Sequence, residues 1–200
     1  GRLTMVQDAD IASGLLVTAD GPSGPMLVLL DADAPGVGRR PARVIDVTRT
    51  WFEVALEDVQ APKDALVSDD PEVVRRTDEI AAVLAAADSL GAAARLLDMT
   101  VAYAKERTAF GKPIAAFQAV KHRCADMLIR LESGRVAVWY AALALRDGRE
   151  DASEAAAIAK FYATEAASWI SGEALQLHGG IGMTWEHDLH LFLKRAKANE

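Results

Sequence analysis

The chain has 200 residues, of which 51% are hydrophobic, and its 22 Lys and Arg against 29 Asp and Glu give a net charge of −7. The acidic balance argues against a general nucleic-acid binder, because neutralising phosphates needs a basic stripe and the cations here are scattered. We expect no membrane span, since the apolar run at 27–30 is too short and the run at 81–94 is interrupted by Asp88. The single cysteine, Cys124, excludes an internal disulfide and predicts a cytoplasmic protein.

Residues 1–70 alternate short apolar runs with turn residues, which predicts strands and hairpins. The predicted strands are 13–18, 26–30 and 51–56. Clusters of Gly, Pro and Asp separate them. A sheet fragment this small is expected to be incomplete. We therefore interpret residues 1–70 as part of a β-domain.

From about residue 71 the composition turns to alanine and leucine, with charges spaced for helices. Apolar residues between 79 and 106 recur with the 3.6-residue period of an amphipathic helix. Further helices are predicted over 117–145, from 151 or 153 to 177, and over 186–197. Long helices with brief connections predict an antiparallel four-helix bundle over residues 71–200. The expected fold class is therefore α+β, mainly α.

Two joints between the predicted helices have unusual sequences. In the first, at 106–118, Arg107 would oppose the negative end of a helix, Gly111 would supply a left-handed cap and Pro113 would prevent continuation. The second, at 176–182, reads Gln-Leu-His-Gly-Gly-Ile-Gly. Its paired glycines either end a helix or let the backbone approach a phosphate closely. Taken alone, each joint could be no more than the end of a helix, so neither joint decides between a helix end and a binding site.

Together the two joints resemble the signatures of the flavin-dependent acyl-CoA dehydrogenases. The first signature is Tyr-Ala-Lys-Glu-Arg-Thr-Ala-Phe-Gly-Lys-Pro-Ile at 103–114, and the second is Gln-Leu-His-Gly-Gly-Ile-Gly-Met-Thr-Trp-Glu at 176–186. Turns at 31–37 and 56–59 are similar to those of the family's middle β-domain. Residues from about 72 onward resemble its C-terminal four-helix domain. The family's helical N-terminal domain would precede Gly1 and is expected to be absent from this chain.

The resemblance implies that FAD binds at an interface between subunits. It implies that Arg107 meets the pyrophosphate, where its planar guanidinium can contact two oxygens. Phe110 is then expected to pack against the adenosine side and Gln118 to hydrogen-bond to the cofactor. Gln176 and Gly180 are expected to meet the dinucleotide of the adjacent subunit, Gly180 because a side chain would block the approach.

Binding between subunits implies a homo- or hetero-oligomer, either a dimer or a dimer of dimers. The third predicted helix carries five alanines between 155 and 163 that would allow close approach of a neighbour's helix.

The implied reaction is α,β-dehydrogenation of an acyl-CoA thioester to trans-2-enoyl-CoA, as in fatty acid β-oxidation, with electron-transfer flavoprotein as the acceptor. A carboxylate removes the α-proton while the β-hydrogen leaves as hydride to the flavin. Most of the family place this carboxylate a few residues beyond Glu200. A second branch places it at the position of Ala81, which cannot accept a proton.

Asp88 is the candidate base within the chain, because seven residues return it to nearly the same helix face as Ala81. The alternative is that Asp88 hydrogen-bonds within the bundle. Two functions therefore stay open. The protein is either an acyl-CoA dehydrogenase or a non-catalytic partner subunit that shares FAD binding but lacks the base.

The four histidines do not form a metal-binding pattern, so no metal site is predicted. We expect surface or interface positions for them. They are His122, His178, His187 and His190.

Overall fold

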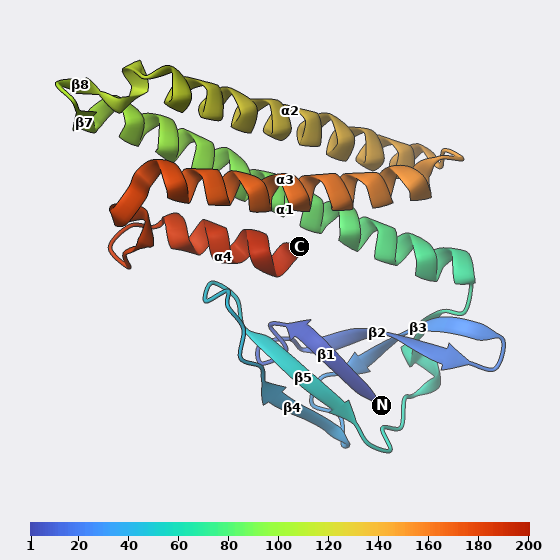
Figure 1. Cartoon of the computed structure of the whole chain (residues 1–200). Helices are drawn as coiled ribbons and strands as arrows, with labels where there is room; N and C mark the ends of the chain where they lie inside the picture. Colours follow the sequence, from blue (N-terminus) through green and yellow to red (C-terminus); the bar gives the residue numbers. More distant parts are fainter. The chain divides into compact units, whose positions relative to one another are not determined.

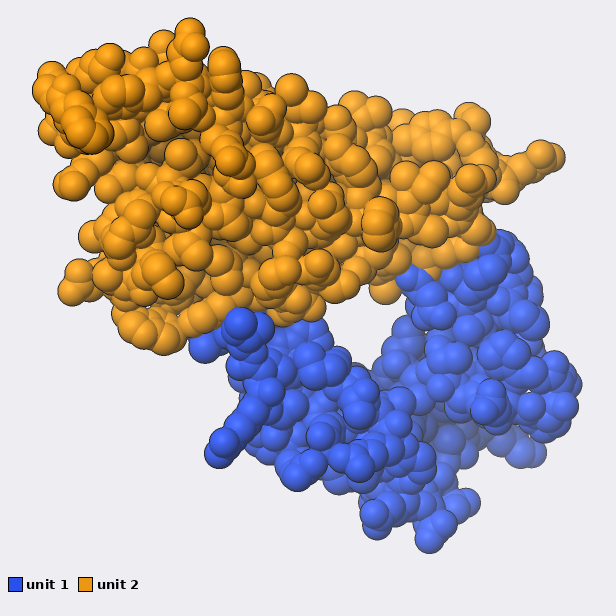
Figure 2. Space-filling model, viewed as in Figure 1, with its two compact units in different colours: residues 1–78 blue, residues 79–200 orange.

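The computed structural model describes residues 1–200, which divide into two compact units, residues 1–78 and residues 79–200 (Figure 2). The first unit is built of β-strands and the second of helices (Figure 1). This arrangement confirms the predicted α+β, mainly helical fold. The division between the units falls eight residues after the change in composition at residue 70, within the first turns of the long helix that begins at Pro71.

The first unit contains two three-stranded antiparallel sheets. One sheet has the order β1 (Arg2–Gln7), β5 (Trp51–Leu56) and β4 (Val37–Pro41), and the other has the order β2 (Gly14–Gly21), β3 (Gly24–Asp31) and β6 (Leu66–Ser68). A short 3₁₀ helix, η1 (Lys63–Ala65), precedes β6. The predicted strands correspond to β2, β3 and β5.

The core of this unit consists of the inward-facing apolar side chains of β2, β3 and β5. The largest are Leu15, Val17, Val28, Leu30, Phe52 and Val54. The turn before β4 requires Gly36, because a Cβ there would lie 2.1 Å from the carbonyl oxygen of Glu57 and the backbone has a φ of +91°. A glycine is the residue that accepts such a conformation without strain.

The second unit is a bundle of four helices (Figure 1). They are α1 (Pro71–Glu106), α2 (Gln118–Asp147), α3 (Ala152–His178) and α4 (Leu189–Asn199). The first joint contains β7 (Thr108–Ala109), β8 (Lys112–Pro113) and the 3₁₀ helix η2 (Ile114–Ala116), and the second contains the 3₁₀ helix η3 (Gly179–Met183).

Helix α1 begins eight residues earlier than its apolar periodicity predicts. The Oδ1 atom of Asp70 accepts a hydrogen bond of 2.9 Å from the backbone N–H of Glu72, and Pro71 occupies the first helical position. Both features favour a helix start, because a proline there loses no helical hydrogen bond and a carboxylate satisfies a free N–H group. Helix α4 begins three residues later than predicted, after the turn that ends at Asp188.

The bundle core joins all four helices. Its largest fully buried side chains are Leu96, Met127, Ile170 and Leu189, one from each helix. Helix α2 approaches α1 closely at Gly134, where a Cβ would lie 2.7 Å from Leu90 Cδ2. Four of the α3 alanines expected at a subunit interface are buried within this bundle instead: Ala155, Ala156, Ala159 and Ala163. They allow close packing inside the chain.

Helix α1 is long and apolar enough, by length and composition alone, to cross a membrane, although the interruption at Asp88 led us to expect no such segment. Its apolar residues Leu90, Leu96 and Leu97 lie in the bundle core. In the apolar window of α1, 44% of the residues are buried inside the protein, so packing in the bundle accounts for part of this composition.

Candidate functional site

Helices α1 and α3 end on the same side of the bundle (Figure 1). A recess of about 420 Å³ lies at this end. Its lining comprises Tyr103, Arg107, Ile114, Gln176, Leu177, His178, Gly179, Gly180 and Ile181. The fold thus brings together Arg107 from the first joint with Gln176 and Gly180 from the second. The three line one recess of a single chain, so one ligand could contact all of them.

Arg107 follows the last residue of α1, and its backbone is held on both sides. Its N–H donates a hydrogen bond of 2.8 Å to the carbonyl of Tyr103, and its carbonyl accepts one of 2.8 Å from the N–H of Ile114. The exposed guanidinium has no hydrogen bond or ion pair with any other residue of the described chain. Arg107 is also the only charged residue in the lining. Its donors are therefore available to an anion.

The two adjacent glycines at the end of α3, Gly179 and Gly180, differ in whether the fold requires a glycine there. Gly179 has a φ of +61°, and its N–H bonds to the carbonyls of Leu175 and Gln176, so it caps the helix. Gly180 has no positive φ, and a Cβ placed on it would meet no atom of the chain within 4 Å. The fold requires Gly179 but does not require Gly180. The chain leaves the space beside this exposed glycine open, so an external group could occupy it.

Phe110 and Gln118 lie outside the recess lining. Phe110 is at the tip of the β7–β8 hairpin with a φ of +52°, and its side chain is 95% exposed. Gln118 is exposed and is the first residue of α2. Their proposed contacts with a dinucleotide stay predictions.

The expectation that Gly111 caps a helix was wrong. Helix α1 ends at Glu106, and Gly111, with a φ of +78°, shares the hairpin turn with Phe110. Two consecutive residues with positive φ are typical of a tight two-residue hairpin turn. Sequence reasoning did not identify this hairpin, because each of its strands has only two residues.

The expectation of a surface or interface position was also wrong for His178, whose side chain is 3% exposed. Its Nδ1 lies 2.7 Å from the carbonyl oxygen of Ala174, which can only accept, so Nδ1 carries the proton. Burial lowers the pKa of His178, and the neighbouring His187 lowers it further. His178 is therefore a neutral, buried part of the recess wall. No cluster of three or more His, Cys, Asp or Glu side chains is placed to hold a metal ion.

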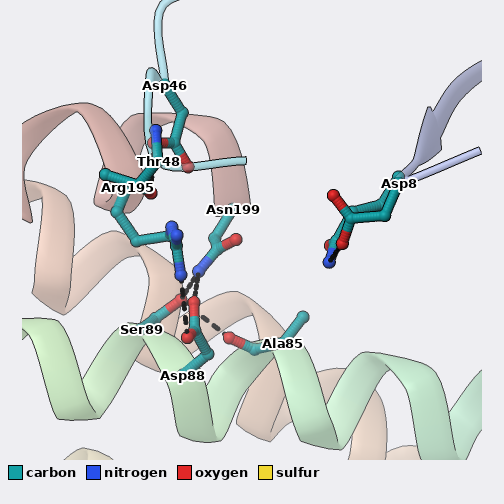
Figure 3. A network of polar contacts seen from close by, with 9 residues as sticks. Asp8, Asp46, Thr48, Ala85, Asp88, Ser89, Arg195 and Asn199 are labelled. Atoms are coloured by element: carbon teal, nitrogen blue, oxygen red, sulfur yellow. Dashed lines mark hydrogen bonds and ion pairs between the residues drawn. The ribbon is translucent and has the colours of Figure 1, made fainter. Parts of the chain in front are cut away.

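Asp88, the candidate base, lies on α1 with both carboxylate oxygens engaged by α4 (Figure 3). Asn199 Nδ2 donates a hydrogen bond of 2.6 Å to Oδ2, and Arg195 Nη1 lies 3.3 Å from Oδ1. Ser89 joins this cluster, because its Oγ accepts from Asn199 at 3.1 Å and donates to the carbonyl of Ala85 at 2.8 Å. These contacts favour the alternative that Asp88 hydrogen-bonds within the bundle.

Comparison with known proteins gives consistent matches. Residues 72–200 match the family model for the acyl-CoA dehydrogenase C-terminal domain. The acyl-CoA dehydrogenase IpdE2 of Mycolicibacterium smegmatis is 49% identical over 118 residues, which are 59% of this chain and 36% of IpdE2. The probable acyl-CoA dehydrogenase YngJ of Bacillus subtilis is 32% identical over 211 aligned residues, covering 100% of this chain and 55% of YngJ.

Solved structures agree over the whole chain. A variant of the Tcur3481-Tcur3483 steroid ACAD has a TM-score of 0.92 and 36% identity, and the match covers 100% of this chain and 53% of that one. The ChsE4-ChsE5 complex from Mycobacterium tuberculosis has a TM-score of 0.94 and 28% identity, with 100% and 54% covered. The chain therefore spans about half the length of these solved chains.

Proposed function

Because the chain belongs to the acyl-CoA dehydrogenase family, we propose that it forms part of an FAD-dependent enzyme that oxidises an acyl-CoA thioester to trans-2-enoyl-CoA. The observation that carries the proposal is the meeting of Arg107, Gln176 and Gly180 in one recess. These residues come from two separate joints, and packing within the chain does not explain Gly180. Related proteins include a subunit of a caffeyl-CoA reductase-Etf complex, which supports a redox partnership with electron-transfer flavoprotein, and we propose that flavoprotein as the electron acceptor.

The residues of the recess suit the pyrophosphate end of FAD. The carbonyl ends of α1 and α3 carry partial negative charge, so an anion would be disfavoured there without a cation. Arg107 supplies that cation, with no carboxylate in the lining to compete for it. Gly180 allows the backbone to approach, and the exposed amide of Gln176 can donate or accept a hydrogen bond. When bound, FAD accepts the β-hydrogen of the substrate as hydride.

The second candidate function is that of a non-catalytic partner subunit. Two observations favour this function. Ala81 has no carboxylate, and the carboxylate of Asp88 is held by Asn199 and Arg195. Two related structures are named as pairs of proteins, Tcur3481-Tcur3483 and ChsE4-ChsE5. In this proposal the chain contributes the recess and another chain contributes the base.

We also propose that the protein is an oligomer, a dimer or a dimer of dimers. The buried α3 alanines are used inside the bundle, so the contact between subunits uses other surfaces. Light scattering on the flavin-loaded full-length protein tests this proposal. A flavin-loaded monomer would contradict it.

Anaerobic reduction of bound flavin by acyl-CoA thioesters tests the proposed function. The full-length protein is purified alone and together with a co-expressed candidate partner, and loss of the oxidised flavin's visible absorbance is followed. Reduction by the protein alone supports the dehydrogenase. Reduction only in the complex, with flavin retained, supports the partner subunit. A protein that holds no flavin in either preparation contradicts both.

A further inference from the structure

Two aromatic side chains stack across the floor of the recess. The rings of Tyr103 on α1 and His178 on α3 have centroids 4.6 Å apart and an interplanar angle of 21°. His187, which precedes α4, meets His178 edge to face at a centroid distance of 4.7 Å. Three segments of the chain therefore meet at His178.

Each stacked residue is directly connected to one half of the recess. Tyr103 lies one helical turn before Arg107, and its carbonyl accepts the hydrogen bond from the Arg107 N–H at 2.8 Å. His178 is two residues before Gly180 and immediately before Gly179, where the chain turns out of α3. Each ring is thus joined through a short stretch of backbone to one of the two recess residues, Arg107 or Gly180.

His178 itself has little freedom to move. Its Nδ1 is bonded to Ala174 in the preceding turn. A Cβ on Gly182 would lie 3.0 Å from the His178 Cβ, so the loop after α3 folds tightly back on it. The charged and titratable groups in contact with the ring or in the recess lining are Tyr103 and Arg107 from α1 and His187 from the segment before α4. None is a carboxylate, and a neutral ring suits these surroundings.

We propose that Tyr103 and His178 are a pair of positioning residues, whose stacked rings hold Arg107 and Gly180 at the separation that the pyrophosphate of FAD requires. The inference rests on the proposed function. In this proposal neither Tyr103 nor His178 contacts the cofactor. Binding sites for anions depend on donors held to within a fraction of an ångström, so a shift between α1 and α3 weakens binding even when both helices remain folded.

The test measures FAD dissociation from the full-length protein, or its complex, in a double-mutant cycle. Tyr103→Ala, His178→Ala and the double variant are compared with Tyr103→Phe and His178→Phe, which keep a ring at each position. We expect each alanine substitution to raise the dissociation constant about tenfold, and the double variant to raise it no further, because either change alone removes the stack. The phenylalanine variants should stay within about twofold of the wild type.

Leu145→Ala provides the control for a general loss of stability. Leu145 is buried in a separate core cluster of the bundle, so its truncation opens a cavity away from the recess. FAD binding is measured well below the melting temperature of every variant, and Leu145→Ala should bind FAD as the wild type does. If Tyr103→Ala or His178→Ala fails to fold, Tyr103→Leu or His178→Leu replaces it. A leucine fills the volume of the ring without stacking, so the same outcomes apply.

Three results would overturn the inference: wild-type affinity in both alanine variants, additive losses in the double variant, or an equal loss in Leu145→Ala. If Arg107→Ala weakens FAD binding while the pair does not, only the inference about the pair fails. If the wild-type protein binds no FAD, the proposed function fails and the inference with it.

Discussion

Asn199, near the end of α4, donates a hydrogen bond of 2.6 Å from Nδ2 to Oδ2 of Asp88 in the middle of α1. Arg195, one turn earlier in α4, lies 3.3 Å from the other carboxylate oxygen. Both oxygens of Asp88 therefore hold α4 against α1. A carboxylate used in this way stabilises the bundle.

Asp88→Asn is accordingly expected to affect stability and leave flavin reduction unchanged. An amide can still accept from Asn199, while the ion pair with Arg195, whose side chain is 20% exposed, is lost. We expect a decrease of about 0.5–1 kcal/mol in the free energy of unfolding, typical of partly exposed pairs. Urea denaturation measures this change, and stopped-flow reduction at matched flavin content measures the chemistry. Near-complete loss of reduction would show that Asp88 is the base.

Stability should depend on pH through His178. The unfolded side chain takes up a proton near pH 6.5, whereas burial lowers the pKa in the folded protein. Between these two pKa values the unfolded state binds more protons, so the free energy of unfolding falls as the pH drops below about 6.5. The loss is complete once the pH is below the folded pKa. The His178→Phe variant lacks the titrating group, so its free energy of unfolding should change less over this pH range than that of the wild type, as measured by denaturation at several pH values. An identical dependence on pH in the two proteins would contradict the assignment of this effect to His178.

Gly180→Ala should separate ligand binding from folding. The chain leaves open space at this Cβ, so the free energy of unfolding should change by less than about 0.5 kcal/mol. A methyl group facing the recess should nevertheless weaken FAD binding by about tenfold or more. Gly172→Ala is the matched control, because its Cβ also meets open space but Gly172 does not line the recess. Equal FAD affinity in the two variants would refute a contact at Gly180.

Phe110 allows a test of the predicted contact with the adenosine side of FAD. Phe110→Gly relieves a left-handed backbone, worth about 1 kcal/mol, and loses an edge contact with Phe117 worth about 0.5–1.5 kcal/mol. The two effects nearly cancel, so stability should change little. If the ring packs against the adenosine, calorimetric titration with ADP should show weaker binding in the variant. Unchanged ADP affinity would place the adenosine elsewhere.

The arrangement of the helices could be predicted from the sequence because strong periodic signals specify them. Composition and spacing indicated the bundle, and the two joints pointed to Arg107, Gln176 and Gly180 before the fold showed that they line one recess. The start of α1 at Pro71 was missed, because its first turns are polar and a cap, not an apolar period, specifies them.

The aromatic pair in the recess could not be predicted in the same way. Tyr103 and His178 are 75 positions apart in the chain (178 − 103), and no local pattern relates them. A lone histidine is usually exposed or partly exposed, so its burial here depends on the packing of α1, α3 and the segment before α4. The strands β1, β4 and β6 were missed because they are short or polar, and pairing with neighbouring strands defines them.

The FAD dissociation constant of Arg107→Ala, compared with that of Arg95→Ala, tests the central claim most directly. Both are exposed arginines, one just after the end of α1 and one within it, but only Arg107 lines the recess. A charge-assisted contact with phosphate contributes about 1.5–3 kcal/mol, so Arg107→Ala should raise the dissociation constant by roughly ten- to a hundredfold. Arg95→Ala should leave it unchanged. Equal affinities in the wild type and in Arg107→Ala would contradict the assignment of the recess to FAD.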